Sequence, residues 1–122
     1  MANPIYQAAA NSVEIDTSGS IVELISGGST FGTVIQQVVL QATGNVSSGM
    51  IRFYIKTDSV NWRLFREVPI PEVIATDQYS AYSSILSFNN LTLPNGIPIG
   101  VSTAVSESFV VAVFGLIIDS YS

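Results

Sequence analysis

The sequence predicts an all-β protein, a single antiparallel β-sandwich of about seven or eight strands in jelly-roll or Greek-key order. In most apolar segments, polar and apolar residues alternate with a period of two, which is typical of strands with one buried face. Turn-forming residues recur about every eight to twelve residues, and no segment has a convincing helical period. The longer connections at 26–32 and 71–80 favour a crossing strand order over simple hairpins.

Residues 1–12 are interpreted as an N-terminal arm, and residues 13–122 as the sandwich domain. Pro4 and the alanine run at 8–10 make the arm too weakly amphipathic to form a stable helix in water. Ile5 and Tyr6 would otherwise lie in solvent, so we expect the arm either to be disordered or to dock onto a neighbouring subunit. Both residues are therefore candidate interface residues.

Three strands are expected before the middle of the chain. Two short ones lie at 13–16 and 21–25, on either side of a turn at 17–19. Gly27–Thr30 is predicted to be a turn, since it has neither the lysine nor the glycine spacing of a phosphate-binding loop. Residues 33–42 fit both a helical and a strand period, and their β-branched content favours a strand. The loop that follows predicts that this strand and the next are antiparallel neighbours.

Residues 49–72 are predicted to form a central hairpin. Ile51, Phe53 and Ile55 mark the buried face of its first strand. A turn at 57–61 leads into a second strand at 62–68, which two prolines are expected to end. This hairpin contains the only tryptophan and all four basic residues of the chain, namely Trp62, Arg52, Lys56, Arg63 and Arg66.

The C-terminal part predicts three further strands. The strand at 81–88 places its larger side chains mostly on one face, with Ser83, Ile85 and Ser87 on the other. A turn is expected at 94–96, where Pro-Asn-Gly follows a leucine-rich segment, and a short strand at 101–105.

The last strand, Phe109–Ile118, is apolar on both faces. The face with Val111 and Val113 is expected to enter the core. The face with Val110 and Phe114 is expected to be covered by the second sheet, by the arm or by another subunit, which makes these two residues interface candidates. Gly115 is expected to mark a bulge or a close backbone approach that swaps the faces beyond it.

The composition limits the classes of partner. Only 11% of the 122 residues are charged, against about 25% in typical soluble domains, so we expect part of the surface to be covered by other chains in a homo-oligomer. The formal net charge of -5 argues against nucleic acid as a partner. The longest apolar run is shorter than a membrane span, and no signal peptide is recognised, so no membrane partner is expected.

Catalytic, metal and cofactor sites are not expected. The chain has no Cys and no His, which excludes thiolate and imidazole ligands and the usual general base. Glu14 and Asp16 have the spacing to offer oxygens to calcium, but a solvated edge strand is the favoured interpretation. Glu67 and Glu72 resemble a glycosidase pair only in composition. The abundant serines have no activating partner, so an enzyme is not expected.

Aromatic residues suggest an alternative function. Trp62, Tyr54 and Tyr82 have the character of residues that stack on sugar rings in carbohydrate-binding modules and lectin-like adhesion domains. A core or subunit-contact role is favoured for all three. Arg52 and Lys56 share a strand face, and we expect them to pair with acidic residues of a neighbouring chain.

The segments MIRFY, WRLFREVPIP, LTLPNGIPIGVST and SFVVAVFG occur in this order along the chain. In this respect the sequence resembles the small β-sandwich virion proteins of tailed bacteriophages, over residues 33–118. The resemblance implies a non-enzymatic structural role in a phage particle, as a capsid decoration, head-fibre or neck protein. It also implies an oligomer that contacts other virion proteins, is located in the virion and is assembled in the host cytoplasm.

Overall fold

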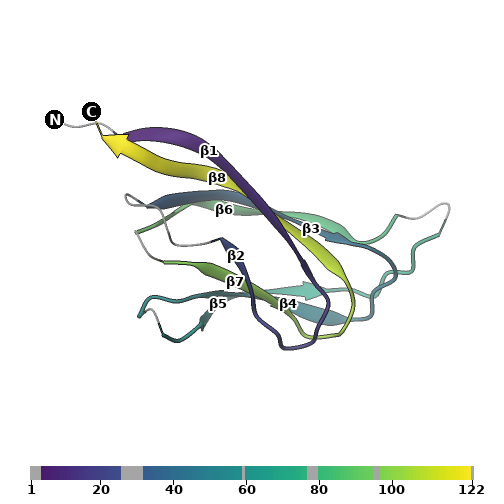
Figure 1. Cartoon of the computed structure of the whole chain (residues 1–122). Helices are drawn as coiled ribbons and strands as arrows, with labels where there is room; N and C mark the ends of the chain where they lie inside the picture. The colour runs from purple at the N-terminus through teal and green to yellow at the C-terminus, as the bar shows by residue number, and fades with distance from the viewer. Residues whose placement is uncertain (1–3, 26–31, 59, 77–79, 95–96, 122) are drawn as a thin grey trace.

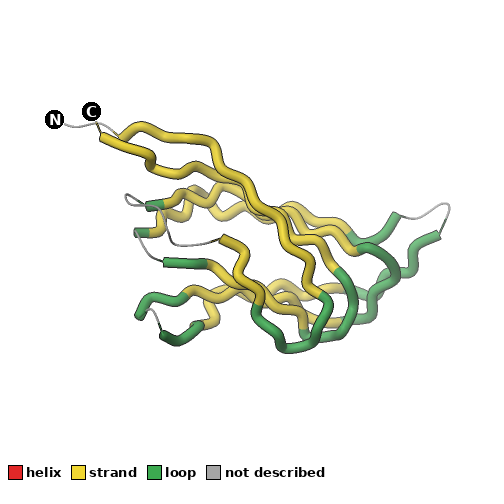
Figure 2. The backbone as a smooth tube through the Cα atoms, viewed as in Figure 1, coloured by secondary structure: helices red, strands yellow, loops and turns green. Residues whose placement is uncertain are grey.

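A computed structural model describes residues 4–25, 32–58, 60–76, 80–94 and 97–121. These residues form eight strands and no helix (Figure 1 and Figure 2). Accordingly, the described part contains no helix of the length and hydrophobicity needed to cross a membrane. The turn predicted at Gly27–Thr30 lies outside the described residues, as does most of the turn predicted at 94–96.

The strands form two antiparallel sheets of four strands each. The first sheet has the order β1-β8-β3-β6, with bounds β1 Pro4–Ile15, β8 Phe109–Tyr121, β3 Thr33–Ala42 and β6 Ser83–Leu93. The second sheet has the order β2-β7-β4-β5, with bounds β2 Val22–Ile25, β7 Ile99–Thr103, β4 Gly49–Ile55 and β5 Arg63–Ile70. Every connection except β4–β5 passes from one sheet to the other, which is the order of an eight-stranded jelly roll. The prediction of an all-β sandwich is confirmed.

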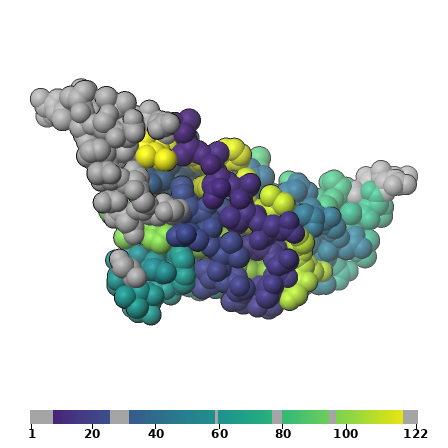
Figure 3. Space-filling view, viewed as in Figure 1, coloured from purple at the N-terminus to yellow at the C-terminus, as the bar shows by residue number. Residues whose placement is uncertain are grey.

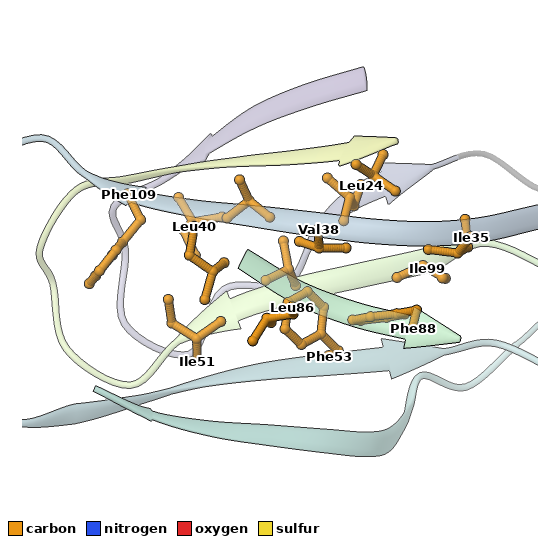
Figure 4. Packing of buried hydrophobic residues seen from close by; sticks show 14 of the residues in the cluster. Leu24, Ile35, Val38, Leu40, Ile51, Phe53, Leu86, Phe88, Ile99 and Phe109 are labelled. Atoms are coloured by element: carbon orange, nitrogen blue, oxygen red, sulfur yellow. The ribbon is translucent and has the colours of Figure 1, made fainter. Parts of the chain in front are cut away.

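The hydrophobic core lies between the two sheets (Figure 4). Ile51 and Phe53 of β4 are fully buried, as the period of two predicts, and Leu86 and Phe88 of β6 face them from the first sheet. Phe53 and Phe88 meet edge to face, with ring centroids 5.5 Å apart, a favourable geometry for an aromatic pair. On β8, Phe109, Val111 and Val113 are buried, so the predicted core face is confirmed.

β3 and β4 are not antiparallel neighbours, so that prediction was wrong. β3 pairs with β6 and β8, whereas β4 pairs with β5 and β7. The loop between them passes from the first sheet to the second, and its Val46 is buried and forms an isolated antiparallel bridge with Val73. A loop anchored by a buried side chain in this way joins the sheets instead of closing a hairpin.

β5 does not end at Pro69 as predicted, but continues to Ile70, with Pro69 opposite Met50. β5 is the edge strand of the second sheet. Proline is tolerated there because its missing N–H removes no hydrogen bond on the free side of an edge strand.

β1 extends across the predicted boundary between residues 12 and 13. It pairs with β8 from Pro4 opposite Tyr121 to Ile15 opposite Phe109, although alanine has a low intrinsic preference for strands. The long apolar β8 provides the edge on which residues 4–12 dock within the same chain, and Figure 1 shows both termini at the end of this pair. The division into an arm and a domain stays a prediction.

Gly115 lies at a close backbone approach, as predicted, since a Cβ at this position would collide with the carbonyl oxygen of Val34. The bulge itself is in β3, whose register with β6 and β8 shifts between Ile35 and Gln37. β8 keeps its register with β1 from Phe109 to Ile118. The predicted swap of faces beyond Gly115 therefore does not occur.

Candidate interaction surface

The outer face of the first sheet is the candidate interaction surface. Strand register aligns its outward side chains in rows that cross β1, β8, β3 and β6 in that order, and three of these rows form the candidate surface. The rows are Ala10–Phe114–Gln37–Ser87, Ser12–Ala112–Val39–Ile85 and Glu14–Val110–Gln41–Ser83. Each row contains at least one apolar residue, and Glu14 at the end of the third row is the one charged residue among them.

The apolar members of these rows are called the apolar face, and they are Ala10, Val39, Ile85, Val110, Ala112 and Phe114. The side chain of Ile85 is 67% exposed and that of Phe114 is 41% exposed. Val39, Val110 and Ala112 are half-buried between them. Large aliphatic and aromatic groups exposed together on one sheet face are typical of surfaces that other molecules cover.

The apolar face has almost no charge. Within the described side chains of β1, β3, β6 and β8, the one charged residue is Glu14, at the margin of the face. Its carboxylate accepts a hydrogen bond of 2.8 Å from the Ser108 hydroxyl. Covering this surface with another protein would therefore desolvate almost no charge, and desolvating a charge is one of the large costs of forming an interface.

Two shallow depressions lie beside Phe114 on the β1 side. One has a volume of about 410 Å³ and is lined by Ala10, Asn11, Ser12, Ala112 and Phe114. The other, of about 330 Å³, lies toward Ala8 and Leu116. The small side chains of β1 line both depressions beside the Phe114 ring, so the face is hollowed next to this residue.

The outer face of the second sheet has a different character, and it is called the polar face, comprising Arg52, Tyr54, Lys56, Trp62 and Glu67. The Nε of Arg52 donates to Glu67 Oε2 at 3.0 Å. The Tyr54 and Ser102 hydroxyls are hydrogen-bonded at 3.1 Å. These polar groups have partners within the chain.

Lys56 and Trp62 also meet on the polar face. The Lys56 ammonium lies 4.5 Å from the centroid of the Trp62 ring, a cation–π contact. The ring edge lies over Gly100, where an added Cβ would be 3.1 Å from it and 2.7 Å from the Ile21 side chain. Gly100 is opposite Tyr54 in the ladder. The structure therefore brings Tyr54 and Trp62 to one place, with Lys56 over the indole.

The other two arginines also have partners within the chain. The Arg63 guanidinium is 3.4 Å from Asp58 Oδ2 in the β4–β5 turn. The backbone N–H groups of Asn61 and Val60 donate to Asp58 and hold the pKa of that carboxyl well below its usual range. Arg66 donates to the Ser87 carbonyl at 3.0 Å and lies over the Phe88 ring, so it links β5 to β6 at one side of the sandwich.

The structure places the predicted interface residues on two different faces. Val110 and Phe114 lie on the apolar face, whereas Arg52 and Lys56 lie on the polar face with partners in their own chain. Ile5 and Tyr6 lie in β1 opposite Ser120 and Ile118, and their side chains are outside the described ones. Their role in an interface stays a prediction.

Tyr82 is not brought to the other two sugar-stacking candidates. It precedes β6 in the first sheet, its carbonyl accepts from the Ala42 N–H, and its ring packs against the core. Glu14 and Asp16 flank the buried Ile15 at the end of β1. No group of three or more Asp, Glu, His or Cys side chains suited to a metal ion occurs among the described residues.

The residues that the sequence analysis did not single out are Ile85 and Val39. They pair across β3 and β6 at the centre of the apolar face. The signal for Ile85 was present, because the period of two separates it from the buried Leu86 and Phe88. Val39 was obscured by the continuous β-branched run around it, in which both faces look equally apolar.

No protein-family model matches the sequence, and no curated protein matches it. The structure is similar to a chain from a solved structure described as the acidic stable capsid structure of Helicobacter pylori bacteriophage KHP30, with a TM-score of 0.65 and 15% sequence identity. The match covers 100% of this chain and 97% of that chain. The two chains therefore share the whole sandwich fold from end to end.

Proposed function

We propose that this chain is a non-enzymatic structural component of a phage particle that attaches to other virion proteins through its apolar face. Its place is in the virion, as a capsid decoration, head-fibre or neck protein assembled in the host cytoplasm. The observation that carries the proposal is the contrast between the nearly uncharged outer face of the first sheet and the internally paired charged residues of the second.

Two further observations support this function. The fold matches along its whole length a chain from a phage capsid structure, and the segments quoted above resemble small virion proteins of tailed phages. An apolar, nearly uncharged sheet face is also suited to permanent assembly, because obligate interfaces have a larger apolar share than transient ones. We include self-association in the proposal, since the low charge of the chain favours surfaces covered by further copies.

The test is a binding measurement on particles made without this protein. Phage particles assembled from a genome with this gene deleted are mixed with purified wild-type protein and sedimented. We expect wild type to co-sediment at saturation. Ile85→Asp is expected to lose at least about tenfold in affinity, because an exposed apolar contact is replaced by a charge that must be desolvated.

Arg52→Ala is the matched control, since it removes a charge from the polar face and is expected to bind like wild type. Unfolding curves of all three proteins establish that each is folded. Failure of wild type to bind the depleted particles would contradict the proposal, as would equal binding by Ile85→Asp.

A second candidate function is the binding of a surface glycan at Tyr54 and Trp62, which the structure places together beside Gly100. The cation–π contact with Lys56 occupies part of the indole that a sugar would need, so this function is the weaker of the two. A glycan array with wild type and Trp62→Ala tests it. Binding by wild type that is lost in a folded Trp62→Ala variant would support an adhesion role.

A further inference from the structure

The four edge strands of the sandwich differ in how they can meet another chain. Edge strands present unpaired backbone groups, and natural proteins block them with short length, charges, proline or bulges. The edges here are β1 and β6 in the first sheet and β2 and β5 in the second. Figure 3 shows the part of β1 that is drawn in purple lying at the surface turned to the viewer.

Three of these edges carry a known form of protection. β2 has only four residues. β5 carries Arg63, Arg66 and Glu67 together with Pro69, and its register with β4 shifts once. β6 is interrupted where Asn89 and Asn90 adopt φ values of 50° and 55°, beside the shift in its register with β3. A regular ladder cannot continue across such interruptions.

β1 has no such protection over most of its length. Its pairing with β8 is regular from Tyr6 to Ile15, the single shift lying between Ile5 and Tyr6. No charged residue occurs between Tyr6 and Val13. Within the described part of the chain the one strand ladder of β1 is with β8. The Asn11 side chain donates to the Leu24 carbonyl of β2 at 2.7 Å, but no strand pairs with the other edge of the β1 backbone.

We propose that β1 pairs antiparallel with β1 of a second copy of this chain, across a two-fold axis at Ala10. A two-fold axis perpendicular to the sheet keeps the outer face of both copies on the same side, and it therefore lies midway between one residue and the same residue of the second copy. Centring on Ala10 aligns Tyr6 with Glu14 of the second copy, so the ladder uses only the regular part of β1.

Charge and geometry both favour a second copy of this chain as the partner that pairs with the open edge of β1. The two Glu14 carboxylates would be separated by eight strand positions, about 26 Å, which is well beyond the physiological screening length of about 8 Å. Each copy has one open edge, so the pairing consumes both edges and stops at a dimer. The two apolar faces would then lie side by side in one continuous sheet of eight strands.

This inference deepens the self-association in the proposed function and does not depend on particle binding, because it concerns the purified protein alone. The chain contains no cysteine, so single cysteines at positions 8 to 12 report on the pairing. Ala10→Cys is expected to form an intermolecular disulfide on mild oxidation roughly tenfold faster than its neighbours, because only the residue at the axis brings two identical Cβ atoms within bonding range.

Ser87→Cys on the interrupted β6 edge is the matched control and is expected to react slowly. Sedimentation of the wild-type chain is expected to give a dimer, and unfolding curves check that each cysteine variant is folded. A wild-type monomer at micromolar concentration would overturn the proposal. So would a cysteine scan without a maximum on β1, or one whose maximum lies on β6. Particle binding by a chain that remains monomeric would overturn the dimer and leave the proposed function standing.

Discussion

The two outer faces of the sandwich have the same architecture and differ in charge, although each exposes apolar side chains, with Leu64 of the second sheet 48% exposed. On the first sheet, Ile85 and Phe114 are exposed with almost no charge around them. On the second sheet, Arg52 is paired with Glu67 and Lys56 lies over Trp62. A face whose polar groups are satisfied internally gains little from a partner, whereas an exposed apolar face gains from every contact that removes it from water.

The largest expected change in stability distinguishes the two faces of β8. Val113→Asp places a charge in the core, and we expect it to lower the free energy of unfolding by about 4 kcal/mol or more and to give insoluble protein. Val110→Asp changes the apolar face, and we expect a folded protein with a smaller assembly. Denaturant unfolding and light scattering measure both. Equal loss of folding in the two variants would show that Val110 is part of the core and not of an interaction surface.

The second prediction compares a glycine beneath each face. Gly115→Ala is expected to destabilise by about 3 kcal/mol, since its Cβ would meet the Val34 backbone, which cannot move aside cheaply. Gly100→Ala is expected to cost about 1 kcal/mol, because the atoms it meets belong to the Ile21 and Trp62 side chains. Thermal unfolding compares the two. A larger cost at Gly100 would mean that the polar face is the more rigid one.

A smaller effect is expected for the ion pair on the polar face. Arg52→Ala and Glu67→Ala, alone and combined, are expected to give a coupling energy below about 1 kcal/mol, because both side chains are substantially exposed. The double-mutant cycle is measured by denaturant unfolding at low and high salt. A coupling energy well above this range and insensitive to salt would indicate that the polar face is shielded from water, as in an interface.

The smallest effect concerns the turn between β4 and β5. The pKa of Asp58 is lowered by the N–H groups of Asn61 and Val60, so the stabilisation is complete above its unfolded pKa of about 3.9 and is lost as pH falls toward the folded value. Unfolding measured from pH 6 down to about pH 2 should show a steeper loss for wild type than for Asp58→Asn. Identical pH profiles would show that the turn does not depend on the carboxylate.

Much of the fold was predictable from sequence because local patterns decide it. The period of two identified the buried faces of β4 and β8, and the turn signals gave the number of strands. Strand partners were harder to predict. The mistaken pairing of β3 with β4 arose because a loop of hairpin length contains Val46, whose burial depends on Val73 far along the chain.

The candidate surface was predictable only in part. Val110 and Phe114 were identified because, in a strand that is apolar on both faces, the face turned away from the core must also be shielded from water. Ile85 joined them only through its register with Val39, which no local pattern specifies. The open edge of β1 was hidden for a similar reason, since an alanine-rich segment becomes a strand only where β8 offers it an edge.

A cryo-EM reconstruction of particles that carry this protein, at a resolution that places its two sheets, would show directly which face contacts other virion proteins. We expect the apolar face, with Ile85 and Phe114, to lie against neighbouring virion proteins, and the polar face, with Arg52 and Trp62, to be turned to solvent. Particles in which the polar face makes the contacts and Ile85 is exposed would contradict this expectation.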